Sequence, residues 1–273
     1  MLKLRRPRYL IPLLLLALLP ACERGTNPTA PDAPAPLAPV PAADAISLED
    51  VVETRPDYIV GISFPKSAAR YPGLAQALKV YADAARNDLM QAVAGLKGRK
   101  PTAPYDLSLS FTGLVDTDDI VAVAADGSSY TGGAHGNPLV ARFVWLPKSG
   151  KMLAVQELFP AANSLQVISD VSREQLATSL SQRLDADGAE GAERAQQLQN
   201  STRMIADGTQ PKAENFAQFE PVMDVSGRIR ALRFVFAPYQ VGRYVDGTRT
   251  VDVPAGILLP IMAAEYKPLF IGG

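Results

Sequence analysis

The spacing of apolar residues changes twice between positions 58 and 113, and this change limits the possible folds more than any other feature of the sequence. Over residues 58–64, the large apolar residues Tyr, Val, Ile and Phe at the even positions alternate with Ile, Gly and Ser at the odd ones. This is the period of a strand with one buried face. Between 74 and 96, apolar residues recur every three or four positions, which predicts an amphipathic helix. A second strict alternation over 105–113 predicts another strand. We therefore expect a sheet with a helix packed on it.

The rest of the chain continues this pattern of separate strand and helix regions. Strands are predicted over 120–125 and 139–146, and the turn at 147–151 leads into another apolar segment. In the second half the spacing predicts helices from about 163 to 184 and over 192–205, then strands over 216–223, 228–236 and 250–253. The turn at 224–227 joins the first two of these strands. Because helices and strands are segregated, the predicted class is α+β, with antiparallel sheets and packed helices in one or two lobes.

The first 21 residues are typical of a secretory leader. Four basic residues lie between positions 3 and 8, and the apolar run at 9–19 is, at about 11 residues, too short to span a bilayer. The run ends in Leu-Pro-Ala-Cys at 19–22, which resembles the bacterial lipobox, and Cys22 is the only cysteine of the chain. We predict that Cys22 is the mature N-terminus and carries the lipid. The alternative is an ordinary signal peptide with an incidental free cysteine.

A lipid on Cys22 would tether the protein, because several acyl chains such as palmitate together anchor a protein durably. Glu23 follows the cysteine, where enteric lipoproteins held at the inner membrane usually have Asp. That resemblance implies the outer membrane, with the protein facing the periplasm. Residues 22–49 are rich in Pro and Ala and are predicted to form a disordered tether that reaches up to about 75 Å. Two α+β domains are expected to follow, at 50–150 and 151–273.

Rare residue types exclude several classes of protein. The 273 residues include one Cys and one His, so a disulfide framework and a compact zinc site are both excluded within one chain, and no metal or cofactor is predicted. Loss of the leader removes four of the 27 basic residues and none of the 28 acidic ones, which leaves a formal charge of −5. A chain of that charge lacks the basic character of a nucleic-acid binder.

Two segments stand out from the pattern of strands and helices. Residues 130–137 read Tyr-Thr-Gly-Gly-Ala-His-Gly-Asn between two predicted strands. The second segment begins with Phe-Ala-Pro-Tyr-Gln-Val-Gly at 236–242 and continues to Tyr244 and Gly247. Together they resemble paired extracytoplasmic domains of unknown function. Relatives of such domains include the lysozyme-sensing anti-sigma factor of the sigma-V system and the N-terminal region of peptidoglycan deacetylases. The resemblance covers about 58–263.

This resemblance implies an α+β module that binds lysozyme or lies beside cell-wall enzymes and is not itself catalytic. The chain departs from both relatives. The anti-sigma factor has a cytoplasmic sigma-binding region and a transmembrane helix, which are not found in this sequence. The deacetylases have a separate metal-dependent domain with several His ligands, which a chain with one His cannot supply.

The candidate binding residues belong to the two segments. In the first they are Tyr130, Thr131, Gly132, Gly133, His135 and Asn137, and in the second Pro238, Tyr239 and Tyr244. The paired glycines allow a turn with positive φ and a close approach by a ligand. The first segment is interpreted either as an architectural turn or as a contact for a ligand or protein, and the tyrosines either as packed rings or as part of a partner surface.

A catalytic role for the first segment is the least favoured interpretation. Asp126, Ser128, Ser129 and His135 lie close together in sequence, but sequence proximity guarantees neither the base–nucleophile contact nor an oxyanion hole. The chain also lacks a Gly-x-Ser-x-Gly elbow. The sequence therefore predicts a non-catalytic periplasmic lipoprotein whose partner is a lysozyme-like muramidase or peptidoglycan. The alternative is a scaffold or accessory lipoprotein of envelope-assembly or stress machinery, without affinity for either.

Overall fold

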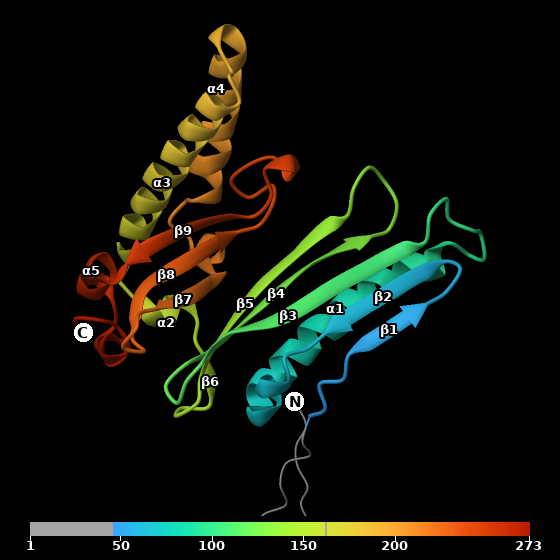
Figure 1. Ribbon diagram of the computed structural model, residues 1–273, viewed down its shortest axis with the longest axis horizontal. Coiled ribbons are helices and arrows are strands. Elements are labelled where there is room, and N and C mark those ends of the chain that lie inside the picture. Colours follow the sequence, from blue (N-terminus) through green and yellow to red (C-terminus); the bar gives the residue numbers. More distant parts are fainter. Residues whose placement is uncertain (1–45, 162) are drawn as a thin grey trace, which may run out of the picture. The chain divides into compact units, whose positions relative to one another are not determined.

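Two sheets organise the part of the chain that the structure describes, residues 46–161 and 163–273 of a computed structural model (Figure 1). The first sheet has the order β1 (Val51–Thr54), β2 (Tyr58–Ser63), β3 (Tyr105–Asp116), β4 (Val121–Tyr130), β5 (Asn137–Leu146) and β6 (Lys151–Met152). The second has the order β7 (Phe219–Met223), β8 (Ile229–Phe236) and β9 (Arg249–Pro254). The predicted leader, the lipid site at Cys22 and the predicted linker up to residue 45 lie outside the described residues.

The α+β class with antiparallel sheets and packed helices is confirmed, and one strand pair in the first sheet is parallel. Strands β2 and β3 are parallel, with Tyr58 opposite Tyr105, whereas the other pairs in both sheets are antiparallel. The reason is α1 (Pro72–Gly95), which returns the chain to the same end of the sheet, as a crossover between parallel strands must. Strand β1 was not predicted, because its four residues are too few to establish an alternation.

Helix α1 covers one face of the first sheet. Its buried residues recur every three or four positions and pack on Leu107, Leu109 and Phe111 of β3. Tyr81 inserts edge-on between Phe111 and Phe143, with ring centroids 6.2 and 5.8 Å away, and its burial raises the pKa of the Tyr81 hydroxyl. Helix α1 and strands β2, β3, β4 and β5 therefore enclose one hydrophobic core.

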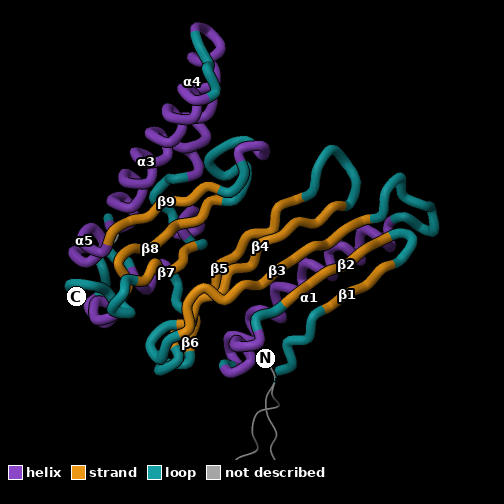
Figure 2. Tube along the Cα trace, in the orientation of Figure 1, coloured by secondary structure: helices purple, strands orange, loops and turns teal. Residues whose placement is uncertain are grey.

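The second sheet packs against a helical layer. Helices α3 (Ser164–Ala186) and α4 (Gly191–Gly208) form a hairpin that extends beyond the strands, and α2 (Val155–Leu158) and α5 (Ala255–Leu258) are single turns (Figures 1 and 2). Phe216 was predicted to begin a strand. It ends a one-turn 3-10 helix instead, and its ring meets Phe234 and Phe236 edge-on at 5.4 and 6.1 Å. Packing of this ring in the core decides the local backbone there.

Strand β7 joins the two halves, because it lies against β4 and β5 of the first sheet. Val144 and Leu146 of β5, and Ile120 just before β4, belong to the hydrophobic core of the second sheet. All of the described residues fall within one compact unit. The first sheet also passes the predicted boundary at residue 150, since β6 pairs with the end of β5.

Candidate functional site

The first candidate segment connects β4 to β5. Both strands are longer than predicted, so that Tyr130 ends β4, Asn137 begins β5, and Ser129 pairs with Asn137 across the ladder. The connection between them, residues 131–136, is called the Gly-His loop below. Gly132 and Gly133 have φ values of 101° and 106°, which confirms the predicted left-handed backbone.

The second candidate segment lies against the Gly-His loop. The ring of His135 stacks on that of Tyr244, with centroids 4.0 Å apart and 14° between the planes. The Tyr239 hydroxyl oxygen is 2.7 Å from His135 Nε2, although the two residues are 104 positions apart in sequence. These three side chains are called the aromatic cluster below. The fold thus brings together residues that the sequence analysis singled out in separate segments.

The two ring nitrogens of His135 are both engaged. Nδ1 is 3.1 Å from the carbonyl oxygen of Gly136, and because a carbonyl only accepts, Nδ1 carries the hydrogen. In the neutral ring, Nε2 then accepts a hydrogen bond from the Tyr239 hydroxyl. His135 is therefore oriented by a backbone group on one side and by a tyrosine on the other.

A Ser-His-Asp triad is not assembled in the described part of the chain. Neither Ser128 nor Ser129 is hydrogen-bonded to His135, whose partners are the two groups just named. Asp126 forms an ion pair with Arg142 instead, with 3.0 Å between Oδ1 and Nη1. A triad requires the base to contact both the nucleophile and the orienting carboxylate, and neither contact is present.

Tyr239 has an unusual backbone and an exposed ring. Its φ is 73°, in the left-handed region that costs a residue with a side chain roughly 1–2 kcal/mol. The surrounding turn holds it there, since its N–H donates to the carbonyl of Gly242 and the Gln240 side chain donates to two further carbonyls. The residue is nevertheless 52% exposed. Such strained positions are concentrated at binding and catalytic sites. The sequence analysis named Tyr239 as a candidate residue, but no sequence signal indicated its positive φ.

Tyr244 is positioned by an almost fully buried carboxylate. It begins a one-turn 3-10 helix that ends at Asp246, whose side chain is only 5% exposed. Asp246 accepts a hydrogen bond from the backbone N–H of Arg243 at 2.8 Å and lies within 4 Å of the guanidinium groups of Arg183 and Arg249. These interactions fix the turn, and the turn fixes the ring that stacks on His135.

Beside the aromatic cluster is an open groove with a volume of about 360 Å³. One wall comes from β4 and β5, and the other from the second segment; the lining residues are Asp126, Gly127, Ser128, Pro138, Val140, Pro238, Tyr244, Gly247 and Thr248. The sequence analysis named Pro238 and Tyr244 as binding residues and placed Gly247 in the second segment, but it missed Val140 and Thr248. In the β4–β5 wall, Ser128 pairs with Pro138 and Asp126 with Val140, so a correct strand register would have placed Val140 there.

A chain of ion pairs lies under the groove and crosses from the first sheet to the second. Arg142, with a side chain only 8% exposed, contacts Asp126 in β4 and Glu220 in β7, the latter at 2.7 Å. Glu220 is also 3.7 Å from Arg233, which forms a two-pronged pair with Asp252 at 2.7 and 2.9 Å. The Asp252 carboxylate raises the pKa of Arg233. This network, which the sequence analysis missed, holds Asp126 in place.

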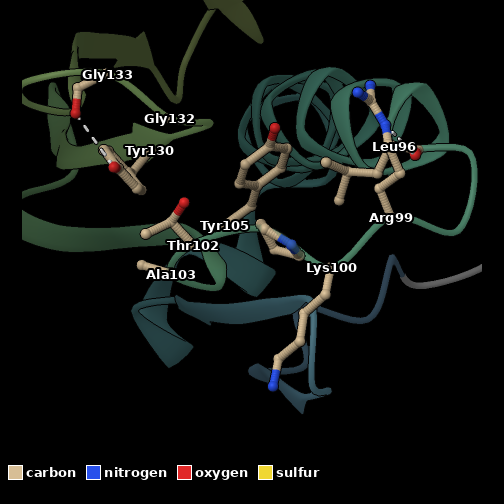
Figure 3. Close-up of a pocket in the computed structure, with 10 residues that line it drawn as sticks. Leu96, Arg99, Lys100, Thr102, Ala103, Tyr105, Tyr130, Gly132 and Gly133 are labelled. Carbon is tan, nitrogen blue, oxygen red and sulfur yellow. Dashed lines mark hydrogen bonds between the residues drawn. The ribbon is translucent and has the colours of Figure 1, made fainter.

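The other side of the Gly-His loop faces a separate hollow of about 540 Å³ (Figure 3). Tyr130, Gly132 and Gly133 line it together with Tyr105, and the Tyr130 hydroxyl donates to the carbonyl of Gly133 at 3.2 Å. Two cationic side chains, Arg99 and Lys100, also belong to its lining, but Figure 3 shows their charged ends pointing away from one another. The charged ends therefore do not converge on one ligand, and the candidate residues are divided between two sides of the loop.

Two classes of feature are absent from the described residues. No group of three or more His, Cys, Asp and Glu side chains is arranged to hold a metal ion within 46–161 and 163–273. Over the same residues, no helix combines the length and the apolar character that a membrane crossing requires.

The fold and the site define an α+β protein in which two sheets present an exposed aromatic cluster beside a groove. No protein-family model matches the chain, and no curated protein sequence is significantly similar to it. A DUF3298 family protein of Pseudomonas aeruginosa PAO1 has a similar structure, with a TM-score of 0.53 and 15% identity over 84% of this chain and 99% of that one. A DUF3298 family member from Bacteroides fragilis NCTC 9343 gives a TM-score of 0.49 at 14% identity, over 80% of this chain and 93% of that one.

The likeness to the Pseudomonas protein concerns the fold alone, because so low an identity carries no information on function. It supports the prediction of a domain of unknown function. The resemblance to the anti-sigma factor and to the deacetylases, and the lipoprotein assignment, stay predictions.

Proposed function

We propose that this chain is a non-catalytic, lipid-anchored protein of the bacterial periplasm that binds a partner in the cell envelope. The observation that carries the proposal is the aromatic cluster, in which His135 and Tyr239 meet at the surface from segments 104 positions apart. Tyr239 has a strained backbone, and its ring is nevertheless half exposed. A role confined to packing would favour a buried ring without strain.

The chemistry of the cluster favours binding. Tyrosine and histidine rings combine an apolar body with a polar tip, and tyrosine is enriched at the centres of interaction surfaces. The stack of His135 on Tyr244 and the hydrogen bond to Tyr239 hold the rings in one arrangement, so little conformational freedom remains to be lost when a partner binds.

The same contacts argue against a hydrolase. The partners of the two His135 nitrogens are a backbone carbonyl and the Tyr239 hydroxyl, so no serine or cysteine nucleophile among the described residues contacts the ring, and the nearby Asp126 is paired with Arg142. A general base must lie within hydrogen-bond reach of the reacting group from which it takes a proton. The groups around His135 orient the ring and do not supply such a group.

Membrane attachment would be through Cys22, for which the leader and the lipobox-like sequence are the support. Two partners follow from the resemblance described above, a lysozyme-like muramidase and peptidoglycan. A scaffold of envelope-assembly or stress machinery is the alternative, and it predicts binding to neither.

The proposal can be tested with a soluble form that starts at residue 23. We would titrate it calorimetrically with a C-type lysozyme and, in parallel, sediment it with insoluble peptidoglycan. Binding to one of the two probes should be saturable and should be lost in His135→Ala, which removes the stack and both hydrogen bonds of an exposed side chain.

The matched control is Tyr71→Phe, which removes one exposed hydrogen bond, to Asp116, outside the candidate segments. It should bind like the unaltered protein. Absence of binding to both probes would contradict the proposal and leave the scaffold alternative.

A further inference from the structure

We infer that the groove beside Tyr244 binds a neutral saccharide ring of a glycan strand. The inference rests on the proposed function, because it names the class of partner that the same site recognises. It follows from the charge, the shape and the hydrogen-bonding groups of the residues that line the groove.

The charge of the lining disfavours an anionic ligand. Among the described residues that line the groove, none is Lys or Arg, and the one ionisable acid is Asp126. Its Oδ1 accepts a hydrogen bond from Arg142 at 3.0 Å, and the side chain is 52% exposed. A carboxylate at an open wall repels phosphates and carboxylates and accepts hydrogen bonds from hydroxyl groups. The electrostatics thus favour a neutral ligand that carries hydroxyls.

The geometry of the aromatic cluster leaves one ring face of Tyr244 available. His135 covers the other face, with 4.0 Å between centroids and nearly parallel planes. Tyr239 is at similar distances from both rings, 5.9 Å from His135 and 5.7 Å from Tyr244, so it lies beside the stacked pair and does not cap it. Tyr244 lines the groove, and within the aromatic cluster neither His135 nor Tyr239 covers its second ring face.

A sugar ring matches this combination of surfaces. Its faces carry C–H groups that pack on an aromatic ring, and its edge carries hydroxyls. In the groove, Tyr244, Pro138, Pro238 and Val140 supply apolar surface, and Asp126, Ser128 and Thr248 supply polar groups. An acyl chain would leave those polar groups without partners, which is costly where a ligand excludes water.

The groove is also largely preformed, which favours a small rigid ligand. Two of its residues are prolines, whose φ is restricted, and Asp126 is held by the guanidinium of the buried Arg142. The groove lies between the two sheets, a usual place for small-molecule sites, and its volume of about 360 Å³ is within the usual range for them. A partner need not reorganise this surface when it binds.

The test uses chitotetraose, a neutral glycan without peptide, and a C-type lysozyme, each titrated calorimetrically into the protein from residue 23 onward. The variant is Thr248→Leu, which takes a hydroxyl from the groove, adds a bulkier side chain without an aromatic ring, and breaks none of the contacts within the protein described above. We expect it to weaken chitotetraose binding by about tenfold, because a sugar hydroxyl loses its partner where the ligand excludes water. The control, Thr250→Leu, makes the same change at an exposed residue outside the groove lining and should bind normally.

A second variant, Asp126→Asn, keeps the shape and removes the charge, and it should weaken chitotetraose several-fold. Circular dichroism melting would establish that each variant is folded. Equal glycan binding by Thr248→Leu and the unaltered protein would overturn the assignment of the groove but not the proposed function. If the protein binds lysozyme but not chitotetraose, the inference of a glycan ligand is wrong and the proposed function still stands. If it binds neither probe, both the inference and the proposed function are wrong.

Discussion

At the scale of single residues, Tyr239 combines two properties that oppose each other in a purely structural role. Its φ of 73° is unfavourable for any residue with a side chain, yet the ring is half exposed and contributes little to the core. The contact that the strained backbone supports is the hydrogen bond to His135. Stability and binding should therefore respond differently to a change at this position.

We predict that Tyr239→Gly leaves the free energy of unfolding within about 1 kcal/mol of the unaltered protein, because relief of strain offsets the added freedom of the unfolded chain. Binding to the partner should nevertheless be lost. Urea denaturation and calorimetric titration of the same sample would measure both quantities. Tyr239→Phe keeps the ring and tests the hydroxyl alone, and a loss of more than about 2 kcal/mol in Tyr239→Gly would show a structural role instead.

Gly127 offers a second prediction at this scale. A methyl group added there would overlap the carbonyl oxygen of Ser108 in the neighbouring strand, because β3 and β4 approach closely at the groove wall. Gly127→Ala should lower the free energy of unfolding by about 2–3 kcal/mol, because an extra methyl group in a closely packed region forces the backbone to shift. The matched control is Gly61→Ala in β2, where no atom lies within 4 Å of the added methyl. Similar urea midpoints for the two variants would contradict this explanation.

At the scale of elements, strands and helices with regular spacing were predictable and their partners were not. The alternation that predicts β3 and the helical spacing that predicts α1 are properties of consecutive residues. The parallel pairing of β2 with β3 depends on where α1 delivers the chain, and no local pattern encodes that. Phe216 illustrates the same limit, because packing against Phe234 overrides its local strand preference.

The candidate site shows the same division. Composition and motif marked His135, Tyr239 and Tyr244, since a glycine-rich turn and a proline-tyrosine turn are visible in sequence. Their meeting across 104 positions follows only from the packing of β7 on the first sheet. Arg142 stands in a strand among apolar residues, and nothing in the sequence identified Glu220 as its partner.

A prediction at the element scale concerns the acid stability of α2. Glu157 accepts a hydrogen bond from the backbone N–H of Ala154 and another from Lys151, and these contacts, the first more than the second, hold the pKa of Glu157 below its usual 4.5. As the pH falls, the unfolded chain takes up its proton first. The contribution of Glu157 to stability is therefore complete above about pH 4.5 and is lost as the pH falls through the lowered pKa.

We expect the melting temperature of Glu157→Gln to lie below that of the unaltered protein at pH 6 and to approach it as the pH falls toward 3. Calorimetric melting at several pH values would measure the difference. A gap that stays constant over this range would show that the charge of Glu157 does not stabilise the fold.

At the scale of the whole molecule, each sheet has its own hydrophobic core, but the two cores do not follow the division of the chain at residue 150. Val144 and Leu146 of β5, and Ile120 just before β4, belong to the core that α3 and the second sheet enclose. The ion pair between Arg142 and Glu220 also crosses between the sheets. A cut at the boundary predicted from the sequence, after residue 150, would expose this apolar surface and leave a buried charge without its partner.

We therefore predict that residues 46–150 alone do not form a stable domain, and that residues 46–273 unfold in a single cooperative transition. Urea denaturation followed by circular dichroism and by Trp145 fluorescence would test the second statement, since coincident curves indicate one transition. Two separate transitions, or a stably folded 46–150 fragment, would show that these contacts between the two halves do not couple their folding.

The direction of β1 has a consequence for how the molecule is presented to its surroundings. Thr54 pairs with Ile59, Ile59 with Asp106, and Asp106 with Tyr130. The last residue of β1 therefore lies at the end of the sheet that bears the Gly-His loop, and β1 runs toward that end (Figure 1). Residues 46–50, which precede β1, therefore enter from the opposite end of the sheet. A partner that meets the aromatic cluster would thus approach the end of the sheet farthest from the point at which the described chain begins.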